Sequence, residues 1–256
     1  MTRRSRGRRI ITGLLLFSSL IALLGFRLEP ISQDFAPSGP QSSRTFRIEN
    51  PGDEMIAVQV SVATREVDLD GGEINRDASN YFMVYPSRLI VKPQTFKTVR
   101  VKYTGPPNPP REIAYRIIAE QVPLNLPGEE KLQGGGIRLA FKYIGNIYIV
   151  PRGVKEEVIL ESARVEVADS GARELVLVFY NRGNRHTLLG DLILQLSQQH
   201  PVYPVIAAQA DLEADTLKGV IGENILAGQR RRFRLPAPEG FGDGEIKAEF
   251  SFRPLH

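Results

Sequence analysis

The sequence predicts an all-β protein built from two antiparallel sandwiches. Short segments in which every second residue is apolar recur along the chain, and proline, glycine and asparagine separate them at a spacing typical of sandwiches. Beyond the first 25 residues, no segment has the 3.6-residue apolar period that indicates a helix packed on a core. The length of 256 residues is enough for two domains that each bury a core.

The N-terminus has the features of a secretory signal. Five arginines precede an apolar run from Ile10 to Gly25, as in the basic and hydrophobic regions of such signals. We therefore expect residues 1–25 to direct export. An uncleaved membrane anchor is the alternative, because Leu20 and Leu23 stand where a cleavage site has small residues. Without this segment the net charge falls from +4 to −1, so basicity no longer supports a nucleic-acid partner.

We expect the first domain to span residues 26–152. Its clearest strand is 56–62, where apolar residues occupy every second position. The other predicted strands in this part of the chain are 26–31, 44–49, 81–85, 88–91, 97–103 and 113–122. Residues 68–80 form a polar loop containing glycine, and their spacing does not match an EF-hand calcium site.

The strand that carries the functional prediction runs from residue 137 to residue 143. Large apolar side chains occupy alternate positions, and three consecutive glycines precede them. These side chains are Ile137, Leu139, Phe141 and Tyr143. One interpretation is an ordinary strand that buries them in its own domain. The other is a sheet edge offered to another chain, because the strand is long and bulky whereas native edges are usually short, charged or interrupted by proline.

We expect the second domain to span residues 153–256. It begins just after Pro151, where an extended strand must stop. Its predicted strands are 158–160, 163–168, 175–180, 189–196, 202–207, 219–221, 231–235 and 246–252. About one hundred residues is the usual size of one sandwich.

The sequence gives no indication of catalysis or cofactor binding. It contains no G-x-S-x-G elbow, no H-E-x-x-H, no P-loop and no G-x-G-x-x-G. It also contains no cysteine, so its three histidines have no thiolate to complete a structural zinc site. We therefore expect no enzymatic activity, no metal, no cofactor and no small-molecule substrate.

Several short motifs, in order and spacing, are similar to those of the periplasmic pilus-assembly chaperones of the chaperone-usher pathway. Most lie between residues 81 and 151, and they are Tyr85-Pro86, Lys92-Pro93, Thr98–Val101, Arg111–Ile117, Glu120–Pro123 and the strand ending at Pro151. A thinner likeness continues through Tyr180-Asn181 and Gly242–Gly244. The resemblance implies two immunoglobulin-like sandwiches in an L-shaped arrangement.

The resemblance also implies a function for the strand at 137–143. In this family the strand enters the groove of a pilus or fimbrial subunit that lacks its own final strand, which is donor-strand complementation. The chaperone then delivers the subunit to an outer-membrane usher, all within the periplasm. We therefore expect pilus subunits and an usher as partners. The alternative is a structural or adhesive two-domain protein whose strand is buried in its own sheet.

Two positions depart from the family pattern. Family members hold the subunit's C-terminal carboxylate with an arginine in the first strand and a lysine in the last strand of domain one. Here the corresponding residues are Ser32 and Asn146, which are both uncharged. Three basic residues are candidates to replace them, namely Lys142, Arg27 and Arg116.

Three further positions match an interdomain salt-bridge cluster of the family. They are Arg100, Glu112 and Asp243. If they meet, they would fix the angle between the sandwiches more than they would add stability. The competing interpretation is three unrelated surface charges.

Overall fold

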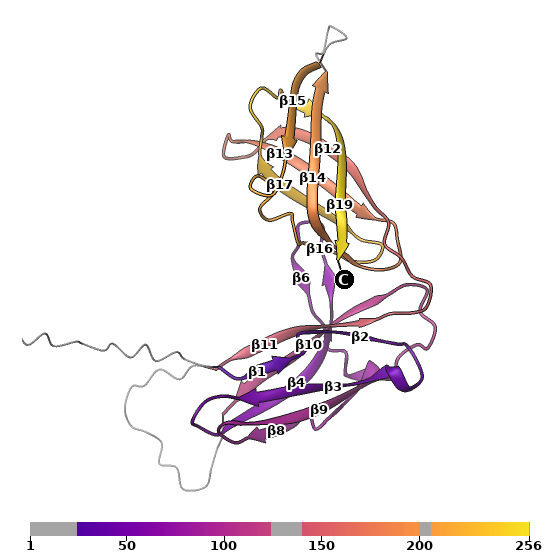
Figure 1. Cartoon of the computed structure of the whole chain (residues 1–256), viewed down its shortest axis with the longest axis vertical. Helices are drawn as coiled ribbons and strands as arrows, with labels where there is room; N and C mark the ends of the chain where they lie inside the picture. The colour runs from indigo at the N-terminus through magenta and orange to yellow at the C-terminus, as the bar shows by residue number, and fades with distance from the viewer. Residues whose placement is uncertain (1–24, 124–139, 200–205, 256) are drawn as a thin grey trace, which may run out of the picture.

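The computed structural model describes residues 25–123, 140–199 and 206–255. They form two β-sandwiches, which meet at a steep angle so that the molecule is L-shaped (Figure 1). The all-β class, the two sandwiches and the L-shaped arrangement are therefore confirmed. Almost all of the predicted signal lies outside these ranges. Within them, no helix has the length and apolar character that crossing a membrane requires.

The first sandwich packs a four-stranded sheet on a five-stranded sheet. The four-stranded sheet has the order β1 (Arg27–Glu29), β3 (Ser43–Asn50), β9 (Thr95–Tyr103), β7 (Phe82–Tyr85). The five-stranded sheet has the order β2 (Ser32–Phe35), β11 (Lys142–Ile149), β10 (Ile113–Val122), β4 (Ile56–Thr64), β8 (Arg88–Val91). Two single turns of 3-10 helix lie in the connections, η1 (Pro40–Ser42) and η2 (Ser79–Tyr81). All neighbouring strands in these sheets are antiparallel except β2 and β11.

Alternating side chains build the core of this sandwich. In β4, Val58, Val60 and Val62 are buried, whereas Gln59 and Ser61 between them are partly exposed. Successive residues of a strand point to opposite faces of the sheet. The alternation that predicts this strand therefore reflects the burial of one of its faces.

The first predicted strand changes sheets at Pro30. β1 pairs antiparallel with β3 in one sheet, and β2 pairs parallel with β11 in the other. Pro30 lies between the two and has no N–H group with which to continue a ladder. The sequence predicts one strand over residues 26–31; in the structure β1 ends at Glu29, just before this proline, and β2 begins beyond the predicted strand at Ser32. As a result, β2 reaches β11 only from Ser32 onward.

The second sandwich also consists of two sheets. One has the order β17 (Arg230–Pro236), β13 (Arg173–Asn181), β12 (Val158–Val167), β18 (Gly244–Glu245). In the other, β14 (Thr187–Gln199) pairs with β15 (Ile206–Leu212), β16 (Asn224–Ile225) and β19 (Lys247–Leu255). Leucine and phenylalanine side chains fill the space between the sheets, among them Leu177, Phe179 and Leu194.

Two predictions for this second domain differ from the structure. The first two predicted segments form one continuous strand, β12, with an irregularity between Leu160 and Ser162. The prediction of a strand at 219–221 is wrong, because these residues form a turn. Gly219 and Gly222 there adopt φ angles of 85° and 79°, which lie outside the extended region of a strand.

A small hairpin occupies part of the predicted loop at 68–80. Its strands β5 (Glu66–Val67) and β6 (Glu73–Ile74) form a separate two-stranded sheet. Figure 1 shows β6 between the two sandwiches. The carboxylate of Asp68 closes the hairpin turn by accepting hydrogen bonds from the N–H groups of Asp70 at 2.9 Å and Gly72 at 2.7 Å.

Two adjacent residues of β10 provide a test of this packing. Ile117 is fully buried in the first core, whereas Ile118 is partly exposed on the opposite face. Ile117→Ala should lower the free energy of unfolding by about 2–5 kcal/mol, because it removes buried methyl groups and leaves a cavity. Ile118→Ala should cost clearly less, and urea unfolding followed by tyrosine fluorescence measures both. Equal losses for the two variants would contradict the assignment of faces.

Candidate functional site

One flank of β11 is open over half of its length. β10 pairs with β11 from Lys142 to Ile149, but β2 pairs with its other flank only from Asn146 to Ile149. Among the described residues, no strand pairs with that flank at 142–145. An unpaired edge of this kind presents main-chain groups to which another strand can add.

Two hydrogen bonds show which main-chain groups face the open flank. The N–H of Gln121 in β10 donates to the C=O of Phe141 at 2.8 Å. The N–H of Asn146 donates to the C=O of Ile31 at 2.7 Å, on the side of β2. Because the groups of successive residues point to opposite flanks, those of Ile144 face away from β10. The main chain of Ile144 is therefore directed to the open flank.

Of the four side chains predicted to enter a partner, the structure describes two. Phe141 and Tyr143 are half-buried against the core of their own sandwich. Tyr143 also contacts Phe26 edge-on, with ring centroids 4.7 Å apart. Ile137 and Leu139 lie outside the described residues.

The two positions that depart from the family pattern lie side by side. Ser32 and Asn146 are Cα partners, and they form the first pair of the β2–β11 ladder. They therefore stand where the open flank ends. The side-chain oxygen of Asn146 accepts hydrogen bonds from the guanidinium groups of Arg116 and, at 3.5 Å, of Arg65. Two positive charges thus adjoin this uncharged position.

The three basic candidates lie in different places. Arg116 contacts Asn146 directly. Lys142 lies at the other end of β11, with its amino group 3.8 Å from the carboxylate of Glu120. Arg27 is exposed on β1, which belongs to the opposite sheet. Of the three, the structure brings Arg116 to the predicted anchor positions.

Arg65 and Arg116 bind the same carboxylate. The Nε of Arg65 lies 3.0 Å from Oε1 of Glu73, and the Nε of Arg116 lies 3.0 Å from Oε2. The two arginine side chains are 10% and 16% exposed, and the Glu73 side chain is 25% exposed. Ion pairs that are largely shielded from water are worth more than surface pairs. These three residues, which we call the Glu73 cluster, form a charged site at the end of the open flank.

The surroundings of Glu73 keep its carboxyl group ionised. Burial raises the pKa of Glu73, but the hydrogen bond from Arg116 and the charges of Arg65 and Arg116 lower it by more. The pKa therefore lies below its ordinary value of 4.5.

A chain of polar contacts connects the Glu73 cluster with the second domain. Arg65 donates to the hydroxyl of Tyr148 at 3.0 Å, and Asn224 of the second domain donates to the same hydroxyl at 2.8 Å. The ring of Tyr148 stacks on His186 of the second domain, with centroids 3.8 Å apart and planes 10° from parallel. The cluster is thus next to the domain interface.

Glu112 is buried at this interface and contacts His186. Its Oε1 lies 2.6 Å from Nδ1 of His186, and the two side chains are 1% and 2% exposed. The same oxygen accepts the main-chain N–H of His186, and the N–H of Glu112 donates to the C=O of Asn184 at 2.9 Å. Three contacts therefore join Glu112 of the first domain to Asn184 and His186 of the second.

The predicted salt-bridge cluster does not form as a unit. Glu112 lies at the interface, but the prediction is wrong for Arg100 and Asp243. Arg100 faces outward on β9 and donates to the hydroxyl of Ser43 at 2.8 Å. Asp243 pairs with Arg173 within the second domain at 2.9 Å.

Other charged residues join the domains in their place. Asp34 of β2 lies 3.5 Å from Arg185 of the second domain. At the tip of the β5–β6 hairpin, Asp70 forms a bidentate salt bridge with Arg232 of β17. The two carboxylate oxygens of Asp70 lie 2.6 and 2.5 Å from two guanidinium nitrogens of Arg232. The N–H of Arg232 also donates to the C=O of Leu69 at 2.7 Å. The hairpin therefore spans both domains.

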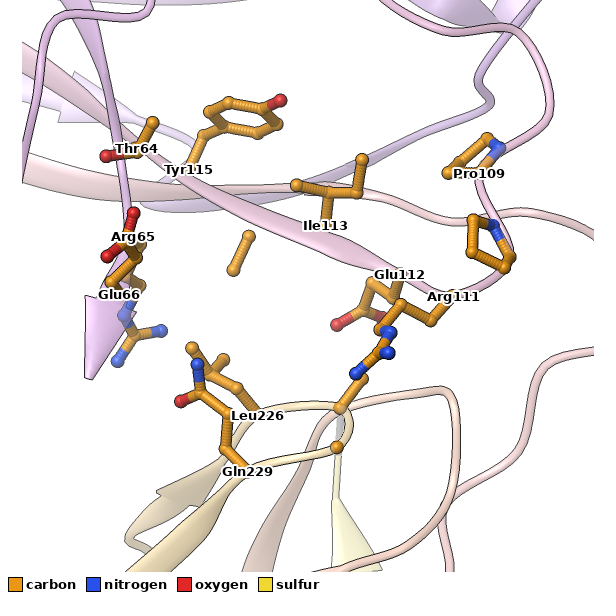
Figure 2. Close-up of a pocket in the computed structure, with 14 residues that line it drawn as sticks. Thr64, Arg65, Glu66, Pro109, Arg111, Glu112, Ile113, Tyr115, Leu226 and Gln229 are labelled. Carbon is orange, nitrogen blue, oxygen red and sulfur yellow. The ribbon is translucent and has the colours of Figure 1, made fainter. Parts of the chain in front are cut away.

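A pocket of about 520 Å³ lies between the domains beside this hairpin. Figure 2 shows its walls, to which the first domain contributes Arg65, Arg111 and Ile113 and the second contributes Leu226 and Gln229. Arg65 thus belongs both to this pocket and to the Glu73 cluster.

Sequence periodicity does not indicate Arg65, Glu73 or His186 as site residues. Each contact joins separate elements, and Glu73 and Arg116 lie 43 residues apart in the chain. The one usable signal is the composition of residues 68–80, whose several acids and glycines stand out among apolar strands.

The lowered pKa of Glu73 predicts a pH-dependent stability. A carboxyl group with a lower pKa in the folded than in the unfolded chain stabilises the fold above its unfolded value, near 4.5, and this stabilisation is lost as the pH falls through the folded value. Glu73→Gln should therefore lower the melting temperature most at neutral pH, and the difference from wild type should shrink toward about pH 3. Glu66→Gln is the control, because Glu66 forms an exposed pair with Arg76. A difference that is constant with pH would exclude this role for Glu73.

The buried contact of Glu112 should also be measurable. Glu112→Ala removes a buried carboxylate that accepts the main-chain N–H of His186 and contacts its ring nitrogen, so it should lower the free energy of unfolding by about 1–3 kcal/mol. Small-angle scattering should show a wider range of domain orientations. Glu120→Ala, which removes an exposed pair with Lys142, should cost about 0–1 kcal/mol. An unchanged scattering profile for Glu112→Ala would show that other contacts fix the angle.

Comparison with known proteins relates the first domain to a family. Residues 36–155 match the family model of the pili and flagellar-assembly chaperones, PapD N-terminal domain. No curated relative matches the chain in sequence.

Solved structures with the same fold are remote in sequence. The chaperone–tip subunit complex CsuC–CsuE of the archaic Csu pili of Acinetobacter baumannii matches with a TM-score of 0.57 at 14% identity, covering 88% of this chain and 98% of that chain. The class 5 fimbriae chaperone CfaA matches with a TM-score of 0.52 at 16% identity, covering 90% and 100%. The Salmonella enterica SafA pilin complex with the SafB chaperone gives 0.52 at 16%, covering 91% and 98%. These matches extend the shared fold over both sandwiches. The first sandwich matches the N-terminal domain of the pili and flagellar-assembly chaperones.

Proposed function

We propose that this protein is a chaperone that stabilises pilus or fimbrial subunits in the periplasm by pairing the open flank of β11 with a strand of the subunit. The observation that carries the proposal is that, among the described residues, no strand pairs with this flank at 142–145, while the other flank is fully paired with β10. A subunit strand could add to the sheet there through main-chain hydrogen bonds. The five-stranded sheet would then continue into the subunit.

Alternate side chains of the strand would supply the affinity. Alternate positions of the strand are occupied by Ile137, Leu139 and Phe141, so in an extended strand these side chains would lie on one face. Phe141 is already half-buried in its own domain, so the gain would come mainly from Ile137 and Leu139. Burying these two in a subunit that lacks its final strand would contribute about 3–6 kcal/mol in gross terms. The loss of rigid-body freedom and the ordering of the preceding loop offset part of this.

The anchor positions would set the register of the bound strand. The open flank ends at the pair formed by Ser32 and Asn146, so a strand that fills the flank would reach its end there. Its terminal carboxylate would then lie near Arg116, which contacts Asn146. We propose that this contact takes the place of the charged pair that other family members use.

The remaining parts of the proposal follow from the family. The chaperone would pass its subunit to an outer-membrane usher after export directed by the N-terminal segment. It would act by binding alone, with no catalysis, no cofactor and no nucleic acid.

A structural or adhesive two-domain protein is the second candidate. The half-burial of Phe141 and Tyr143 in their own core favours it, because these side chains already have partners. In that case, strand 137–143 would complete its own sheet.

Matched substitutions in the strand separate the two functions. Leu139→Glu should leave the chain folded but abolish co-purification of a one-to-one partner from periplasmic extracts, because a charge cannot enter an apolar groove. Ala140→Glu, at an exposed position of opposite parity, should retain the partner. Mass spectrometry should identify that partner as an immunoglobulin-like subunit lacking its last strand. Undiminished capture by Leu139→Glu would refute strand donation, and a large fall in its melting temperature would favour the structural alternative.

A further inference from the structure

Arg65 and Arg116 require a negatively charged neighbour. Both guanidinium groups are largely shielded from water, and two shielded positive charges without a counter-charge are costly. Among the described residues, the carboxylate that forms ion pairs with them is that of Glu73. An anion at this site therefore stabilises both guanidinium groups.

The element that supplies this anion does not belong to either sandwich. Glu73 lies in β6, and the β5–β6 hairpin has two residue pairs, Glu66 with Ile74 and Val67 with Glu73. A two-stranded hairpin of this length has little stability of its own. The two arginines, in contrast, lie on or beside the long strands β4 and β10 of the five-stranded sheet. The cationic half of the site is therefore fixed, and the anionic half is carried by a weaker element.

The site also lies at the end of the open flank. Asn146, which accepts hydrogen bonds from both arginines, is the first residue of β11 that β2 covers. Tyr148 adds a hydroxyl within 3.0 Å of Arg65. A carboxylate entering here would therefore meet two guanidinium groups, an amide and a hydroxyl.

We propose that Arg65 and Arg116 form a carboxylate-binding site, that Glu73 occupies this site in the unbound chain, and that a partner's carboxylate displaces Glu73. The displacement step rests on the proposed function, whereas the site itself does not. One carboxylate replaces another, so neither arginine is left without a counter-charge during the exchange. The hairpin tip remains bound to the second domain through Asp70 and Arg232, so Glu73 can leave without release of the hairpin.

Acetate is the probe that tests the site. In NMR titrations at constant ionic strength, with acetate replacing chloride, the Nε–H signals of Arg65 and Arg116 report binding. Glu73→Ala should bind acetate about tenfold more tightly than wild type, because the internal competitor is gone. Acetamide, which has the same shape but no charge, should not shift these signals. In wild type, the Cδ signal of Glu73 should move toward its exposed value as acetate increases.

Matched variants guard against indirect effects. Glu66→Ala removes an exposed carboxylate from the same hairpin and should bind acetate as wild type does. Adding Arg116→Gln to Glu73→Ala should abolish binding. If Glu73→Ala does not fold, Glu73→Gln and the wild-type Cδ signal still decide the question. Equal acetate affinity of wild type and the Glu73 variants, with no movement of the Cδ signal, would overturn the proposal. It would show that Glu73 is a permanent ion-pair partner of the two arginines. The co-purification experiment is independent of this result, so either proposal can fail alone.

Discussion

The parallel pairing of β2 with β11 stops at Asn146, and the rest of the functional surface depends on that limit. Pro30 ends the first strand in one sheet, so β2 enters the other sheet too late to cover the first half of β11. β10 holds the opposite flank along the whole strand. Within the described part of the chain, the sandwich is therefore complete in its core, and no strand pairs with the main-chain groups of β11 at 142–145 on the side of β2. An exposed edge of this kind can pair with a strand of another chain, and the proposed strand addition uses this property.

The charged residues between the domains are organised around the end of this edge. The Glu73 cluster lies at Asn146, and Tyr148 connects it to the second domain through Asn224 and the stacked ring of His186. The β5–β6 hairpin contributes to the cluster and also binds β17. The angle between the sandwiches is thus determined by contacts that surround the proposed binding site. A ligand that enters the site would act on the residues that join the domains.

Local patterns predicted the fold well, and they predicted the site in part. Strands such as β4 and β10 were predictable because burial of one face leaves a two-residue period in the sequence. The motifs between residues 81 and 151 were sufficient to predict the family. The turn at 219–221 was mistaken for a strand because its buried Val220 produces a similar pattern. The contacts of Arg100, Glu112 and Asp243 could not be predicted, because positions that match a family motif do not determine which side chains meet across a domain interface.

The central claim is that the Ile144 main chain is free to pair with a partner strand, and hydrogen exchange of its amide tests this most directly. In the isolated chain the Ile144 amide should exchange far faster than that of Tyr143, which faces β10 within the same strand. In the complex with the co-purified partner it should become protected, while Tyr143 changes little. Slow exchange of the Ile144 amide in the isolated chain would show that the flank is already closed and would contradict strand donation.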